Sequence, residues 1–366
     1  MTGFDLSTIS NCYIGNTAVS AIYIGSDKLW TTTQHDYSQD YLTFRAIDSG
    51  TFTFTANDLQ YSLDNGTTWT TLTSGTASPT VSAGSKIMWK QTGLTPNSSN
   101  GIGTFSATGK FKVYGNIMSL YYGDNFVGQN DLTGKDYAFK SLFDCSNVTS
   151  YIADASNLIL PATTLANNCY VNMFYNCTSL TTAPQILPAT TLAQYCYSSM
   201  FANCASLITV PELPATTLVD SCYRQMFRDC TSLTTTPELP ATTLANNCYR
   251  NMFTRCSSLV MASELPATTL DVESYRGMFL NCTSLTTAPE LPATTLANGC
   301  YSNMFKGCSN LSSITMLATD ISASSCLSSW VQSVAASGTF TKAASMTTLP
   351  TGNNGIPTGW TVQDAS

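Results

Sequence analysis

The sequence has few charged residues and a single histidine. Only 10% of its 366 residues are charged, and the histidine, His35, lies in a polar segment. A Ser-His-Asp triad and most zinc sites need histidine, so these chemistries are excluded at the outset. Lys and Arg total 15 against 22 acidic residues, a net charge of −7. Because neutralising phosphates requires surplus cations, the balance argues against a general nucleic-acid binder.

Long apolar runs are also missing. No stretch of 18 apolar residues occurs, so we expect no membrane span, and the opening MTGFDLSTIS lacks the basic start and apolar core of a signal peptide. Neither a GxSxG motif nor a Gly-rich phosphate loop is found, and the acidic residues form no local pair such as a glycosidase would use. We therefore predict no catalytic, cofactor-binding or metal-binding residues and no enzyme.

What the sequence does contain is a repeat. The segment LPATTL and its variants recur with one step of 27 residues and then steps of 26. The consensus unit reads LPATTLAxxCYxxMFxxCTSLTTAPE, and its copies begin at Leu160, Leu187, Leu213, Leu239, Leu265 and Leu291. A diverged copy precedes them, from Tyr137 to Val148, and a degenerate one follows at Leu317. A single unit cannot bury its own apolar stripe, so we expect the copies to stack around one core.

The pattern inside each unit predicts its local structure. In Cys-Tyr-x-x-Met-Phe-x-x-Cys the apolar residues stand at i, i+1, i+4, i+5 and i+8, which predicts one or two helical turns. The Thr-rich stretch that follows predicts a short strand, and LPATTL an extended or turn segment. In the second copy the predicted inward residues are Leu187, Leu192, Cys196, Tyr197, Met200, Phe201, Cys204 and Leu207.

Thirteen of the 14 cysteines lie in the repeat region and form two series. The first is Cys169, Cys196, Cys222, Cys248, Cys300 and Cys326, with Ser274 in the missing place; the second is Cys145, Cys177, Cys204, Cys230, Cys256, Cys282 and Cys308. Recurrence once per unit favours buried free thiols that pack as small apolar groups. Disulfides and a metal site are alternatives, although CxxC pairs are absent. Free thiols imply assembly in a reducing cytoplasm.

The chain is expected to have a mixed β and α/β fold in four parts. Residues 1–40 are predicted to form a β-hairpin anchoring module with a linker, and 41–120, where polar and apolar residues alternate, an Ig-like β-sandwich. Residues 121–326 would hold the repeat array with its N-terminal cap, and 327–366 a C-terminal cap. That cap would contain an amphipathic helix from Cys326 and closing strands at Gly338 and Gly359.

One short motif lies in the predicted sandwich. Residues 62–69, SLDNGTTW, match the Asp-box pattern S-x-D-x-G-x-x-W of sialidase propellers. In that motif Asp and Gly shape a hairpin bend while Trp packs behind it. Propellers carry several copies and this chain has one, so the motif predicts a structural hairpin rather than a glycosidase.

Charged residues recur at the outward positions of the repeat. The candidate binding surface consists of Arg224, Arg250 and Arg276, which stand 26 residues apart, together with Arg228, Arg255 and Lys306. A second column, Glu212, Glu238, Glu264 and Glu290, precedes each LPATTL segment. These columns either keep the array soluble or form a contact face for a charged glycan or a neighbouring protein.

The CTSLTTAPELPATTL units resemble BspA-like leucine-rich repeats, found in surface proteins of gut Bacteroidetes and some protists. The chain departs from that pattern by having CYxxMF where IGxxAF is more common, and its unit is three residues longer. The opening CYIGNTAVSAIYIGSDKLW resembles the short N-terminal modules of phage virion proteins, and the whole layout is similar to proteins of gut bacteria and their phages. The resemblance implies a leucine-rich-repeat solenoid that acts in adhesion or host recognition.

Two settings fit that resemblance. The first is a non-catalytic phage virion protein, such as a capsid- or tail-attached fibre or decoration. Its N-terminal module would bind other virion proteins, and its repeats a host-surface glycan or protein. The second is a bacterial cell-surface adhesin. A glycan hydrolase is a third, less favoured reading. We expect no nucleic-acid or membrane partner and leave a homo-oligomer possible.

Overall fold

The computed structural model describes residues 35–146 and 151–365 in full, and the backbone of four short strands before them. The chain divides into two compact units, residues 1–37 and 38–366. In the first unit, β1 (Cys12–Ile14) pairs with β2 (Thr17–Val19), and β3 (Ala21–Ile24) pairs antiparallel with β4 (Asp27–Thr31). The predicted hairpin between β3 and β4 is therefore confirmed, whereas its turn and side chains lie outside the described residues.

The second unit begins with an open six-stranded sheet in the order β12-β11-β5-β9-β7-β8. Its strands are β5 (Leu42–Ala46), β7 (Leu59–Ser62), β8 (Thr70–Leu72), β9 (Lys86–Lys90), β11 (Phe111–Asn116) and β12 (Ile152–Ile159). All neighbours are antiparallel except β11 and β12, which are parallel. The alternating strands predicted within residues 41–120 are confirmed, but the sheet also contains β12 from outside that range, so the predicted bounds of this part are too narrow.

Alternation fixes which face of this sheet is buried. On β5 Phe44 is buried while Arg45 is exposed, and on β11 Val113 is buried while Lys112 is exposed. A second, two-stranded sheet of β6 (Phe52–Phe54) and β10 (Phe105–Ala107) belongs to the same buried core. The short α1 (Ser119–Tyr122) and the 3-10 turns η1 (Tyr37–Gln39) and η2 (Gly123–Asn125) are the helical elements of the described chain.

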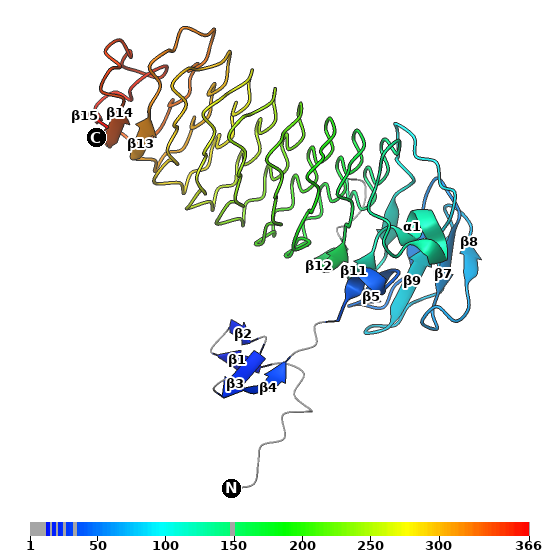
Figure 1. Ribbon diagram of the computed structural model, residues 1–366. Helices are drawn as coiled ribbons and strands as arrows, with labels where there is room; N and C mark the ends of the chain where they lie inside the picture. Colours follow the sequence, from blue (N-terminus) through cyan, green and yellow to red (C-terminus); the bar gives the residue numbers. More distant parts are fainter. Residues whose placement is uncertain are drawn as a thin grey trace. The chain divides into compact units, whose positions relative to one another are not determined.

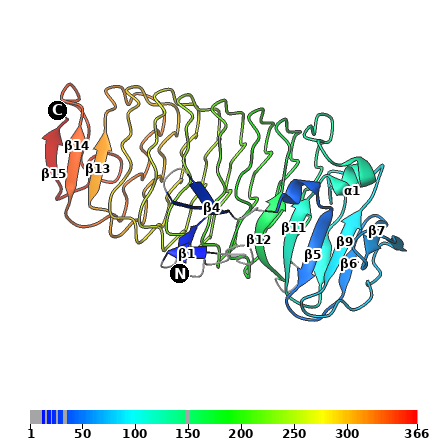
Figure 2. The ribbon, with the colours of Figure 1, turned by 60° about the horizontal axis from the view of Figure 1, so that its bottom comes forward.

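The parallel pairing of β12 continues into the repeat copies. Isolated parallel bridges join Asp154 to Thr182, Thr235 to Met261, and Thr287 to Ser313. The series ends in a parallel three-stranded sheet of β13 (Ser313–Met316), β14 (Thr339–Lys342) and β15 (Thr361–Asp364). Figures 1 and 2 show the copies lying side by side between β12 and β13. The predicted closing strands are confirmed as β14 and β15.

The helical turns predicted in each copy are wrong. Residues 165–177 and their equivalents form consecutive four-residue turns, each with one residue in the left-handed region. In the fourth copy these residues are Asn247, Asn251 and Arg255, with φ of 54°, 57° and 61°. The C-terminal amphipathic helix predicted from Cys326 is replaced in the same way, with positive φ at Ser325, Ser329 and Ser333.

Spacing between copies explains why turns replace a helix. Stacked rings of neighbouring copies lie 5.3–6.1 Å apart, whereas packed helices need 8–10 Å between their axes. A series of four-residue turns also places the apolar residues at i, i+4 and i+8 on the same side of the chain. The left-handed positions are occupied mostly by Asn, Ser and Gly, the residues with the smallest steric cost there.

Backbone hydrogen bonds in the turn region alternate between two partners. The amides of Tyr249 and Phe253 donate to the carbonyls of Ser274 and Met278 in the next copy, at 3.0 and 2.9 Å. The intervening amide of Met252 donates to the carbonyl of Tyr249 in its own copy, three residues back. Every inter-copy backbone bond of the turn region therefore points toward the next copy, whose carbonyls accept from the amides of the copy before it.

Two columns of aromatic rings run through the copies. Tyrosines from Tyr170 to Tyr301 stack with interplanar angles of 2–25°, and phenylalanines from Phe174 to Phe305 stack within 9°. All eight residues predicted to face inward in the second copy are buried, from Leu187 to Leu207. Burying a large apolar side chain contributes about 1.5–3 kcal/mol, so these columns dominate the stability of a copy.

The array is closed at both ends by other parts of the chain. At the start, the amide of Phe105 on β10 donates to the carbonyl of Leu142, and the Phe105 ring stacks on Phe143. At the far end Trp330 contacts both Tyr301 and Phe305, which ends the two columns. The Trp330 indole N–H donates to the carbonyl of Gly355, and the amide of Ser329 to Asn354 Oδ1. In the part of the chain described, no helix is long and apolar enough to cross a bilayer.

Candidate binding surfaces

The thirteen cysteines of the repeat region are buried free thiols. From Cys177 to Cys308, each thiol of the second series donates to a phenylalanine carbonyl of the preceding copy; Cys256 reaches Phe227 and Cys282 reaches Phe253, both at 3.1 Å. Burial raises the pKa of the Cys222, Cys256 and Cys308 thiols to about 12. Since the thiolate is the nucleophile and the metal ligand, these groups are inert packing elements.

The six cations predicted to form a binding surface lie on the turn region, but most are already paired. Arg250 and Arg276 both contact Glu273, which lies between them. Partial burial lowers the pKa of Arg250, against the attraction of Glu273. Arg224 stands in the same column without an ion pair among the described residues, and the Nε atoms of Arg224 and Arg250 are buried without a hydrogen-bond partner.

The remaining predicted cations form a second group. Arg228 and Arg255 both bind Asp229, at 2.9 and 2.5 Å. Burial would raise the pKa of Asp229, but hydrogen bonds from Arg255 and Arg228 hold it below its usual value. Lys306, three copies along from Arg228, is half-buried and stands apart from both groups. The structure thus brings Arg224, Arg250 and Arg276 together and leaves Lys306 outside.

The acidic column lies on another part of each copy. Glu212, Glu238, Glu264 and Glu290 are all exposed. They follow the Thr-rich segment. The threonine pair of each LPATTL segment, such as Thr242 and Thr243, is exposed as well, except that Thr164 in the first copy is half-buried. This part of the array therefore presents a mostly uncharged hydroxyl surface with one carboxylate in each of four successive copies.

The Asp-box residues form the predicted hairpin between β7 and β8. Asp64 accepts hydrogen bonds from the Thr68 hydroxyl, the Thr68 amide and the Ser62 hydroxyl, and these bonds lower the pKa of Asp64 to about 2. The Trp69 indole N–H donates to the carbonyl of Gly66, and its ring packs under Lys90, 4.2 Å from the ammonium nitrogen. Ser62, Asp64, Gly66 and Trp69 of the motif all take part in the hydrogen bonds that shape the turn, which is the structural role predicted for it.

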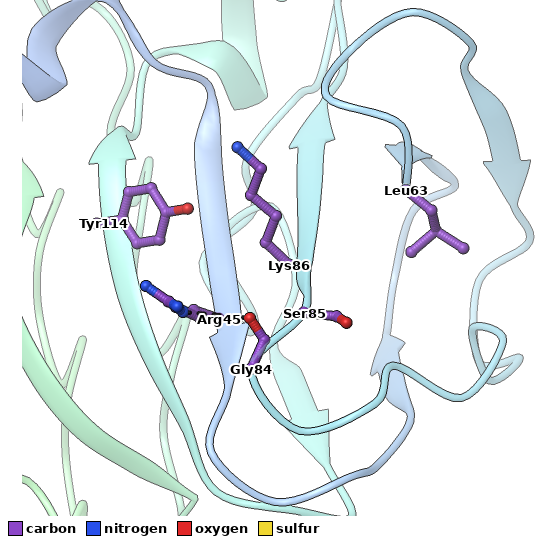
Figure 3. A pocket seen from close by; sticks show the side chains of 6 residues that line it. All are labelled: Arg45, Leu63, Gly84, Ser85, Lys86 and Tyr114. Atoms are coloured by element: carbon purple, nitrogen blue, oxygen red, sulfur yellow. Dashed lines mark hydrogen bonds between the residues drawn. The ribbon is translucent and has the colours of Figure 1, made fainter.

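A hollow of 430 Å³ lies on the outer face of the six-stranded sheet. Its lining residues are Arg45, Leu63, Gly84, Ser85, Lys86 and Tyr114. Figure 3 shows Tyr114 and Lys86 on either side of the strand that carries Arg45, with Leu63 beyond Lys86. The hollow thus combines two cationic side chains with one aromatic ring and one apolar side chain.

The cations at this hollow are direct cross-strand neighbours. Arg45 on β5 is in register with Lys86 on β9 and with Lys112 on β11. Lys112 binds Asp154 on β12 at 3.1 Å, whereas Arg45 and Lys86 form no ion pair in the described part of the chain. The Arg45 Nε donates only to the carbonyl of Gly84, at 3.2 Å. Like charges that are in register on neighbouring strands destabilise a sheet. The row formed by Arg45, Lys86 and Lys112 is therefore electrostatically unfavourable.

The sequence did not predict this row of three cations. Arg45, Lys86 and Lys112 are 26 or more residues apart and show no common period, because β5, β9 and β11 become neighbours only through the sheet order. The sequence shows only that each of these three strands has a cation at one of the polar positions of its alternating pattern. Only the register brings the three together.

No family model, no curated protein and no solved structure matches this chain.

Proposed function

We propose that this chain is a non-catalytic binding protein, in which a leucine-rich-repeat solenoid presents outward side chains to a host surface. One observation carries the proposal: an unchanging interior supports outward positions that differ from copy to copy. The residue after each stacked tyrosine is Val171, Ser198, Arg224, Arg250, Arg276 and Ser302 in turn. The valine and the arginines at this position are partly exposed, whereas the two smaller serines are buried. Repeat arrays use such a framework to vary a binding face without changing the fold.

The arginine column is the part of this solenoid best suited to a ligand. Arg250 and Arg276 share one carboxylate, Glu273, and Arg224 has no ion pair among the described residues, so the group of four has a net positive charge. The Nε atoms of Arg224 and Arg250 are buried, so a bidentate acceptor such as a carboxylate would pair with the terminal guanidinium nitrogens. Host-surface glycans and acidic protein segments both carry such groups.

For the setting, we favour a phage virion, with the N-terminal module binding other virion proteins. The support is the resemblance of the opening segment together with buried free thiols, which suit assembly in a reducing cytoplasm. The alternative is a bacterial surface adhesin. Mass spectrometry of density-gradient-purified phage particles separates the two: the chain in the particles supports the virion, and its presence only in outer-membrane fractions overturns it.

Binding itself is tested with the fluorescently labelled chain on intact bacteria. We expect saturable binding that is lost after periodate treatment of the cells if the receptor is a glycan, or after protease treatment if it is a protein. Absence of saturable binding across a panel of gut bacteria would contradict the proposal. Release of reducing ends from surface polysaccharide would instead support a hydrolase.

A further inference from the structure

We propose that the hollow on the outer face of the six-stranded sheet binds an acidic oligosaccharide, holding a sugar carboxylate between Arg45 and Lys86 and the sugar ring against Tyr114. This site is separate from the arginine column of the repeats and does not depend on the function proposed for that column.

Charge is the first argument. The chain as a whole has a net charge of −7, yet three of its 15 cations stand in one cross-strand row with a single acid, Asp154. Asp154 binds Lys112 and not the two cations that line the hollow. Arg45 and Lys86 therefore stand in register on adjacent strands without a counter-ion among the described residues, and a bound anion would offset their repulsion.

Shape and chemistry supply the second argument. A volume of 430 Å³ is within the range of small-molecule sites. The guanidinium of Arg45 offers a planar fork of donors that matches a carboxylate, and Lys86 adds a mobile ammonium on the neighbouring strand. Tyr114 and the exposed Leu63 add apolar surface to the lining of the hollow. A charged sugar has both an anion and an apolar ring face, which inorganic anions lack.

The backbone makes the site rigid. Arg45, Lys86 and Tyr114 lie on three adjacent hydrogen-bonded strands, whose opposite face is the aromatic core around Phe44 and Trp89. Arg45 is further held by its bond to the carbonyl of Gly84. Sites built on strands of a packed sheet lose little conformational entropy on binding.

The test measures binding of an oligogalacturonate by calorimetry, with the methyl-esterified oligomer as the uncharged control. We expect binding of the free acid, weakened as salt rises, and none of the ester. R45Q and K86Q should each weaken binding roughly tenfold, as expected for loss of one charge-assisted hydrogen bond. Y114A should weaken binding at high salt as well as at low salt, because it removes a contact that salt does not screen.

Two controls keep the proposal falsifiable. K110Q removes an exposed cation close in sequence to Lys112 that does not line the hollow, and it should change affinity less than twofold. R45Q and K86Q should also leave the unliganded Tm equal or higher, because each removes a cross-strand repulsion. If K110Q and R45Q lowered the affinity equally, binding would depend on the overall positive charge of this face and not on a defined site. Binding of the ester, or tighter binding of single-stranded DNA than of the acid, would overturn the assignment.

Discussion

The sheet segment, residues 38–146, and the stacked copies, residues 151–331, share one continuous core but pack it differently. In the sheet the aromatic rings meet at steep angles, 79° for Phe44 with Phe105 and 86° for Phe52 with Phe111. In the copies the rings lie parallel, within 9° along the phenylalanine column. Because the sequence repeats, each ring has the same type of ring as its neighbour in the next copy. Successive copies with the same conformation place these rings in the same orientation, so the rings stack parallel.

The two regions also differ in how they treat charge. The copies place most cations beside a shared carboxylate, as Arg228 and Arg255 do with Asp229. The sheet leaves Arg45 and Lys86 adjacent and without an ion pair among described residues. Stacking places residues of the same type next to each other in successive copies, so a column of cations needs carboxylates within the array to offset its repulsion. On the sheet, the repulsion is limited to the single pair Arg45 and Lys86, which leaves this pair available to bind an anion.

The largest expected effect is loss of a stacked ring. Phe253→Ala removes the contacts of Phe253 with Phe227 and Phe279 and should lower the free energy of unfolding by about 3–5 kcal/mol through cavity formation. Arg250→Ala, at the surface of the same copy, should cost at most about 1 kcal/mol. Urea unfolding followed by circular dichroism measures both, and equal losses would refute the inside-outside assignment of the copy.

Alkaline pH should weaken the copies before the sheet. The pKa of the Cys256 and Cys308 thiols is raised from 9 in the unfolded chain to about 12 by burial. Stability from a raised pKa is fully present below pH 9 and is lost as pH rises from 9 toward 12, at about 1.4 kcal/mol per pH unit for each thiol. Thermal unfolding at pH 7 to 11 should show a Tm that falls above pH 9. A constant Tm would mean that the thiols are not buried as described.

An intermediate effect is expected at Ser274, which replaces the cysteine of the first series in its copy. Its hydroxyl is fully buried and has no hydrogen-bond partner in the described part of the chain. Ser274→Cys should therefore raise the free energy of unfolding by about 1–2 kcal/mol. The reciprocal change, Cys248→Ser in the preceding copy, should lower it by a similar amount. Chemical denaturation of the pair tests this, and a loss in both variants would contradict it.

The smallest effect concerns the left-handed residues of the copies, most of which are not glycine, whereas most of those in the sheet segment are glycine. Asn251 has φ of 57°, and Gly277 occupies the same place in the next copy. Asn251→Ala should cost about 1 kcal/mol because alanine disfavours positive φ, whereas Asn251→Gly should change stability by only a few tenths. Thermal denaturation of the two variants compares them. A tolerated alanine would argue for helical rather than four-residue turns.

The sequence predicted the interior of the copies well because the repeat itself reports it. Six copies align Leu187, Cys196, Tyr197 and Phe201 with their equivalents, and all four are buried. The helical reading failed because i, i+4 spacing fits both a helix and a series of four-residue turns. The frequent Asn, Ser and Gly before Met and Cys, as at Asn251 and Gly277, were the distinguishing signal. The hollow could not be predicted, since register between β5, β9 and β11 is not encoded in any local pattern.

The most direct test of the account is the triple substitution R224S/R250S/R276S. Serine is the residue that the array itself carries in this column at Ser198 and Ser302. Cell binding and unfolding are measured on the same preparation. We predict a Tm within a few degrees of the parent together with loss of saturable binding to bacteria. The substitutions leave the buried residues of the copies unchanged and remove only the arginine side chains proposed to bind. Retained binding with an unchanged Tm, or collapse of the fold, would contradict it.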